Sequence, residues 1–221
     1  MASEPAWQPV QRIRTHEQVL AQIEERILRG HLRVGDRLPS ERELSETLGV
    51  SRASVREALR VLESMGIIEA NVGSGRDAGS IVSGRSTAAL SNLLRLHMAL
   101  SQFQLKDLVD IRVQLERWAS ERAAALATDE DIRQLRALVA AMDSDELDYV
   151  EFNELDTEFH ITIAKAARNA PLSDLMQALR DAVKTEMTSA FERLPDWRHT
   201  ARQLTTEHAR IVDAIENHDD S

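Results

Sequence analysis

The stretch LGVSRASVREALRVLESMG, residues Leu48 to Gly66, decides the fold. Ser51 is a residue type that caps helix N-termini. The residues after it that recur at the spacing of one apolar helical face are Val55, Ala58, Leu59 and Leu62. Arg52, Arg56 and Arg60 stand four apart and share one edge of the same helix. Because the apolar face packs against the core, we expect the arginine edge to face outward.

The segments on either side of this helix predict the other elements of the domain. HEQVLAQIEERILRG, residues 16–30, has helical periodicity, and residues 40–48 form a short helix with a Ser-x-x-Glu capping box. After the quoted helix come two β-prone runs, residues 66–70 and 80–83, separated by a Gly-rich stretch. Helix, helix-turn-helix and hairpin in this order predict a winged helix-turn-helix with a small β-hairpin wing.

The rest of the chain has long helical segments and short separators. The expected helices are Ser86–Ser101, Leu105–Ala127, Asp129–Ala141, Glu146–Arg168, Leu172–Phe191 and Trp197–Asn217. Long helices with short loops predict an antiparallel all-α bundle, so the fold class is mainly α. We expect two domains, 1–83 for DNA binding and 84–221 for effector binding and dimerisation.

Composition narrows the function classes. The chain has no cysteine, which excludes disulfides and thiolate chemistry. It has no apolar run long enough to span a membrane and no secretory signal, so we expect a cytoplasmic protein without a membrane partner. Of the net charge of -10, residues 1–83 contribute little, with 11 basic and 12 acidic side chains. The acidic excess lies in residues 84–221, which leaves the first domain free to meet a polyanion.

The arginine edge suits double-stranded DNA. A helix of this size fits the major groove, and arginine can bind guanine or phosphate with two parallel hydrogen bonds. Ser51 and Ser54 sit in the first turn, where hydroxyls and backbone N–H groups meet phosphate. Arg37 and Arg42 could hold the flanking backbone, and the wing tip could add Gly73, Gly75 or Arg76. The alternative is a solvated face on which the arginines pair with Glu57, Glu63 or other nearby acids.

GDRLPSERELSETLGVSRASVREALRVLESMGIIE resembles the DNA-binding signature of GntR-type bacterial transcription regulators, and the resemblance runs from His16 to Val82. It implies a winged helix that binds operator DNA as a dimer. The family positions that contact DNA fall here on Arg42, Ser51, Arg52, Ser54, Arg56 and Gly73. The wing sequence GSGRDAGSIV is longer than the compact ending of many members.

Polar side chains interrupt the apolar stripe of a later helix. In FNELDTEFHITIAKAA, Asp156 and His160 lie four apart on the inward stripe, and His208 lies on a similar stripe in the last segment. One carboxylate and two imidazoles facing a bundle interior suit a divalent metal, with zinc expected first and nickel or manganese as alternatives. The alternative is a simple Asp–His hydrogen bond.

Arg112 also lies on an inward helical face, and a buried arginine needs an anion. Glu116, one turn later, could supply it from within the chain. A carboxylate ligand could supply it from outside, bound through two hydrogen bonds. Arg112 is therefore the candidate effector-binding residue.

The segments DIRVQLERWASERAA, ELDTEFHITIAKAARNAPL and EHARIVDAI resemble the FCD effector domain of the fatty-acid-regulator branch of GntR proteins. The resemblance implies a metal held by Asp156, His160 and His208, and a small carboxylic acid as effector. The family's final histidine would follow on a later helix, so we expect either a chain that lacks its last helix or a site with three protein ligands.

These observations predict a ligand-responsive transcription regulator that acts as a homodimer on operator DNA and is not an enzyme. The family resemblance favours a repressor, with an activator as the alternative. One rival is a constitutive DNA-binding dimer without effector. The other is a metalloenzyme fused to a DNA-binding module, with the metal activating water.

Overall fold

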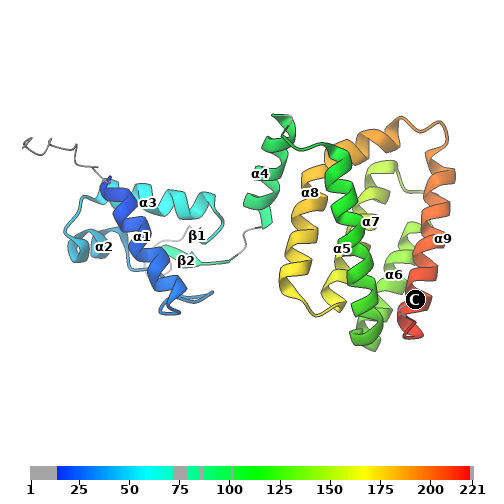
Figure 1. The fold of residues 1–221 in the computed structure, drawn as a ribbon, viewed down its shortest axis with the longest axis horizontal. Coiled ribbons are helices and arrows are strands. Elements are labelled where there is room, and N and C mark those ends of the chain that lie inside the picture. Colours follow the sequence, from blue (N-terminus) through cyan, green and yellow to red (C-terminus); the bar gives the residue numbers. More distant parts are fainter. Residues whose placement is uncertain (1–13, 72–78, 85–86, 101, 220–221) are drawn as a thin grey trace, which may run out of the picture. The chain divides into compact units, whose positions relative to one another are not determined.

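The computed structural model describes residues 14–71, 79–84, 87–100 and 102–219 (Figure 1). The chain divides into two compact units, one up to Ala89 and one from Leu90 onward. This division falls in the first turn of helix α4, a few residues beyond the expected boundary after Ser83.

The first unit is a winged helix-turn-helix, as the sequence predicts. Its elements are α1 (Thr15–Leu28), α2 (Glu41–Leu48), α3 (Arg52–Ser64), β1 (Ile68–Asn71) and β2 (Gly79–Val82). The two strands pair antiparallel with Ile68 opposite Val82, and Arg37 adds an isolated bridge to Ile81. The hairpin and the helices therefore form one small domain.

Local chemistry sets the helix-turn-helix geometry. Ser40 caps α2, and its capping box with Glu43 is formed. Gly49 ends α2 at φ 65°, in the left-handed region that glycine adopts without strain. The core beneath is built from α1, α3, the strands and the preceding loop, and its fully buried members are Val19, Ile23, Leu38, Val55, Ala58, Leu62, Ile68 and Val82. This core turns the opposite side of α3 to solvent.

The second unit is an antiparallel helical bundle, again as predicted. Its helices are α4 (Thr87–Ala99), α5 (Leu105–Leu126), α6 (Asp129–Met142), α7 (Tyr149–Ala166), α8 (Ala170–Glu192) and α9 (Trp197–Glu216). Helix α7 touches α5, α6, α8 and α9, so it is the central helix of the bundle (Figure 1). Phe152 and Phe159 on α7 are fully buried. A polar group on the inner face of α7 is therefore surrounded by neighbouring helices.

Helix α4 packs through Leu94 and Met98 onto a small apolar cluster that α5 and α8 form around Leu108 and Val183. Among the described residues, no helix combines the length and apolar character that crossing a bilayer requires.

Candidate functional site

The outward face of α3 carries the arginines that the sequence singles out. Ser51 caps the helix, and its hydroxyl accepts a hydrogen bond from the Ser54 backbone N–H at 3.1 Å. Arg52, Arg56 and Arg60 are all exposed. The helix thus presents three guanidinium groups and a hydroxyl-lined N-terminus on the surface of the first unit.

Two of the candidate arginines have acidic partners. Arg56 donates to both carboxylate oxygens of Glu41 on α2, with a shortest distance of 2.7 Å from Nη2. Arg42 donates to Glu46 at 3.1 Å within α2. Both pairs are on the surface, where an ion pair contributes about 0–1 kcal/mol to stability.

Two further residues are predicted to contact DNA, Arg37 and Gly73. Arg37 bridges to β2, which places it between the helix-turn-helix and the hairpin. Gly73 lies outside the described residues, as do the other residues of the hairpin tip. Any contact of this glycine with DNA stays a prediction.

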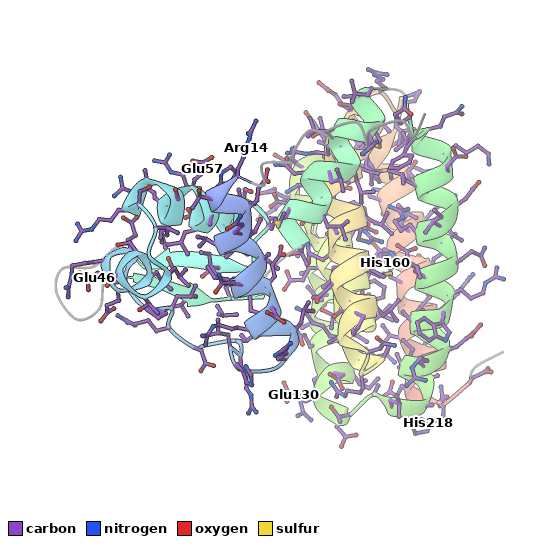
Figure 2. The ribbon with its side chains drawn as sticks, turned by 60° about the vertical axis from the view of Figure 1, so that its left-hand side comes forward. Arg14, Glu46, Glu57, Glu130, His160 and His218 are labelled. Carbon is purple, nitrogen blue, oxygen red and sulfur yellow. The ribbon has the colours of Figure 1, made fainter. Side chains whose placement is uncertain are left out.

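The bundle brings the three predicted metal ligands together. Asp156 and His160 come from α7 and His208 from α9, and one ligand atom of each lies within 4.8 Å of the others. The Oδ1 atom of Asp156 is 3.3 Å from Nε2 of His208 and 3.7 Å from Nε2 of His160. His208 is buried and His160 lies among the bundle helices (Figure 2).

This donor set fits a divalent ion. Bonds of about 2.0–2.1 Å around a tetrahedral zinc place neighbouring donors about 3.4 Å apart, close to the two separations between Asp156 and the histidines. Nδ1 of His160 faces the Glu116 carboxylate at 3.8 Å, the type of outer contact that orients metal-bound histidines. Nδ1 of His208 is buried and makes no hydrogen bond to the described residues.

A second set of charges surrounds the triad. Arg180 of α8 donates to Asp156 Oδ2 at 2.9 Å and to Glu116 Oε1 at 2.6 Å. Arg112, the predicted effector residue, lies 3.3 Å from the same Glu116 oxygen. The Arg180 side chain is only 3% exposed, so its charge must be balanced inside the bundle. Two arginines and two carboxylates achieve this balance.

Arg180 and Glu116 complete a cluster of which sequence reasoning found only part. Arg180 follows Met176 and precedes Val183 on one face of α8, so an arginine within an apolar stripe was the available signal. From the sequence, Glu116 is predicted only as a partner of Arg112. Its contact with Arg180 depends on how α5 and α8 pack, which a single helix pattern does not contain.

Burial and neighbouring charges shift the pKa values of Asp156 and His208. Burial raises the pKa of Asp156, but His160, Arg180 and His208 outweigh it and hold that pKa well below its usual range. Burial lowers the pKa of His208 to about 4, against the opposing attraction of Asp156. An ionised carboxylate beside a neutral imidazole is the state in which both groups bind a metal.

Comparisons with known proteins identify a family for each of the two units. Residues 15–76 match the family model described as bacterial regulatory proteins, gntR family, and residues 107–221 match the FCD domain. The Glc operon transcriptional activator of Escherichia coli K12 is 33% identical over 90% of this chain and 79% of its own length. A second relative from that strain, whose name assigns it to regulation of an L-lactate dehydrogenase operon, is 30% identical over 90% of this chain and 75% of its own. Among solved structures, Streptococcus agalactiae GntR aligns with a TM-score of 0.61 at 25% identity, covering 93% of this chain and 91% of that one.

A winged helix-turn-helix followed by a helical domain with an interior polar cluster defines a DNA-binding transcription regulator. The chain belongs to the GntR family of bacterial regulators, and its C-terminal half is an FCD domain.

Proposed function

We propose that this regulator is a homodimeric repressor whose FCD domain senses a small carboxylate beside a divalent metal ion. The dimer places two α3 helices in successive major grooves of a near-palindromic operator. Domain 1–83 binds DNA, and domain 84–221 binds the effector and the second protomer. The observation that carries the proposal is the convergence of Asp156, His160 and His208 inside the bundle.

The DNA-binding half of the proposal rests on α3 and its surroundings. Arg52 and Arg56 supply donors for base edges, and Ser51 and Ser54 supply the capped N-terminus that suits phosphate. We assign Arg42 on α2 and Arg37, which bridges to β2, to the flanking backbone. Gly73, which lies outside the described residues, is proposed as a wing contact.

The charge of the interior cluster supports a carboxylate as the effector. Asp156 and Glu116 balance Arg112 and Arg180, and His208 is neutral near pH 7. A divalent ion held by the triad would supply two further positive charges and an open coordination position. An anionic ligand neutralises that excess, and Arg112 is the candidate clamp for its carboxylate.

The name of one relative favours the same ligand class. This relative carries L-lactate in the name of the operon that it regulates, which makes small hydroxycarboxylates the first effectors to test. The arrangement offers binding groups and no nucleophile, so we propose a sensor that does not turn its ligand over.

Regulation follows from differential binding. The dimer has two states, one that fits the half-site spacing of the operator and one that fits it poorly. The effector binds the second state more tightly and shifts the dimer toward it. Operator affinity then falls by the ratio of the effector's affinities for the two states. The sign is open to measurement, since an effector that strengthened binding would make the protein an activator.

The test combines metal analysis with calorimetry on the purified full chain. We expect about one divalent ion per protomer in the wild type and none in a His208→Ala variant. We also expect L-lactate or a similar acid to bind only the metal-loaded protein. A wild-type chain that held no metal and bound no acid from the panel would contradict the proposal.

A second candidate has an observation in its favour. Because Arg180 already pairs with Asp156 and Glu116, the interior polar groups could be purely structural in a constitutive DNA-binding dimer. Operator binding that no metal and no carboxylate altered would favour this candidate.

A further inference from the structure

The pair formed by Arg56 and Glu41 has a specific geometry. Nε of Arg56 donates to the Glu41 carboxylate at 3.0 and 3.2 Å, and Nη2 donates at 2.7 Å. The carboxylate therefore binds the side of the guanidinium group that Nε and Nη2 share. This is a two-pronged pairing between α2 and α3, which are joined by the turn at Gly49.

This pairing leaves the outer edge of the guanidinium group available. Both hydrogens of Nη1 and one of Nη2 point away from the carboxylate, and no hydrogen bond to a described residue uses Nη1. The Arg56 side chain is 53% exposed. The end of the group that can donate two parallel hydrogen bonds is thus free, while its orientation is fixed from behind.

Glu41 is itself held in place. It is the first residue of α2, directly after the Ser40 cap, where an acidic side chain is favoured by the helix dipole. The hydrogen bond from Arg56 lowers the pKa of Glu41, and the charges of Arg52 and Arg60 lower it further. Glu41 is thus an anion that is paired with Arg56 and lies within the electrostatic range of Arg52 and Arg60.

We propose that Glu41 is a positioning residue that presents Arg56 to a guanine base and makes this arginine a specificity determinant. The inference rests on the proposed placement of α3 in the major groove. Guanine offers O6 and N7 as two acceptors, which match the outer edge of a guanidinium group. Glu41 does not touch DNA in this account; it fixes the side-chain rotamer of Arg56 before binding, which reduces the entropy lost on contact.

Charge distinguishes this role from simple phosphate binding. The Arg56–Glu41 pair has no net charge, so it gains little from the general attraction to the DNA backbone. A carboxylate this close to the duplex also repels phosphate. An arginine used only for backbone affinity would bind better without such a partner, whereas a directional base contact keeps its value.

The experiment is a selection from a randomised duplex library by the full chain. Single-base replacements of the selected duplex then measure the preference for guanine at each position. The variants are Glu41→Gln, Arg56→Lys and the double variant. Glu57→Gln is the matched control, because it removes the same charge from an exposed residue next to Arg56. Thermal unfolding checks that every variant is folded.

We expect Arg56→Lys to weaken a guanine preference at one base pair of each half-site, because lysine lacks the planar two-pronged edge; the wild-type preference should be about 5- to 150-fold. Glu41→Gln should reduce the same preference by about fivefold or more and leave the other positions unchanged. The double variant should lose no more than Arg56→Lys alone, and Glu57→Gln should keep the wild-type profile.

The inference is overturned if Glu41→Gln leaves the guanine preference within about twofold of wild type. It is also overturned if Arg56→Lys weakens binding equally for all four bases, because that result makes Arg56 a phosphate contact. If the wild type selects no sequence at all, the placement of α3 in the groove is itself wrong.

Discussion

At the scale of single residues, the bundle interior is organised by charges that balance one another. Arg180 is almost fully buried and holds Asp156 and Glu116 on separate nitrogens. Removing one partner of a buried ion pair leaves an uncompensated charge, which costs far more than the pair contributes as a unit. Arg180 therefore supports the position of Asp156, which the triad requires.

We predict that Arg180→Met lowers the free energy of unfolding by about 3–5 kcal/mol. Arg136→Met is the matched control, because Arg136 pairs with Asp213 and Glu216 on the surface and should cost less than about 1 kcal/mol. Urea denaturation of the metal-free proteins measures both values. Equal losses in the two variants would show that the interior cluster has no special energetic role.

The depressed pKa of His208 predicts a loss of stability in mild acid. The unfolded chain takes up a proton near pH 6.5, whereas folded His208 takes it up only near pH 4. The unfolded state thus binds more protons between these values, so the free energy of unfolding falls as the pH falls. The expected loss is about 2 kcal/mol from pH 7 to pH 5.

Denaturation at several pH values, with a chelator present, measures this slope. His208→Gln should remove it, whereas His199→Gln, which replaces an exposed histidine, should keep it. A wild-type slope that survived in His208→Gln would assign the acid sensitivity to other groups.

The sequence predicted part of the interior cluster. Asp156, His160 and His208 were found because each polar side chain falls on an apolar stripe. Arg180 also lies on an apolar stripe, but its pairing with Asp156 and Glu116 depends on how α8 packs against α7 and α5. A one-dimensional pattern shows that a residue is inward, but it does not show which inward residues meet.

At the scale of elements, most helices begin and end near their predicted limits, and the differences have local causes. Helix α7 begins at Tyr149 rather than Glu146, because Asp148 caps it and forms a capping box with Glu151. Helix α8 begins at Ala170, before the predicted Leu172, because Asn169 caps it and a proline is tolerated in the first turn. Both signals stand in the sequence, whereas apolar periodicity locates only the middle of a helix.

Helix α3 carries the next prediction. Arg52→Ala should weaken operator binding by about 1–3 kcal/mol, because an exposed guanidinium in the first turn of the recognition helix loses its contact with a base. Fluorescence anisotropy with a selected duplex measures the change. Arg133→Ala removes an exposed arginine of α6 and should leave the affinity unchanged. An equal effect of both substitutions would indicate a general charge effect in place of recognition.

At the scale of the whole molecule, the two halves of the chain differ in net charge. In the proposed function the arginine edge of α3 contacts DNA, a polyanion, while most of the acidic excess of the sequence lies in the half that contains the bundle. A regulator requires that occupancy of one unit changes the affinity of the other, and such coupling is usually 1–3 kcal/mol, or about 5- to 150-fold. A measurement of this coupling distinguishes a ligand-responsive regulator from a constitutive DNA-binding dimer, in which the coupling is absent.

The most direct measurement is operator affinity of the full chain with and without L-lactate and related small carboxylates, in metal-loaded and chelated protein. We predict that one acid lowers the affinity by about fivefold or more in metal-loaded wild type, and that the effect disappears in chelated protein and in His208→Ala. Unchanged affinity across the whole panel, in protein shown to hold its metal, would contradict the account.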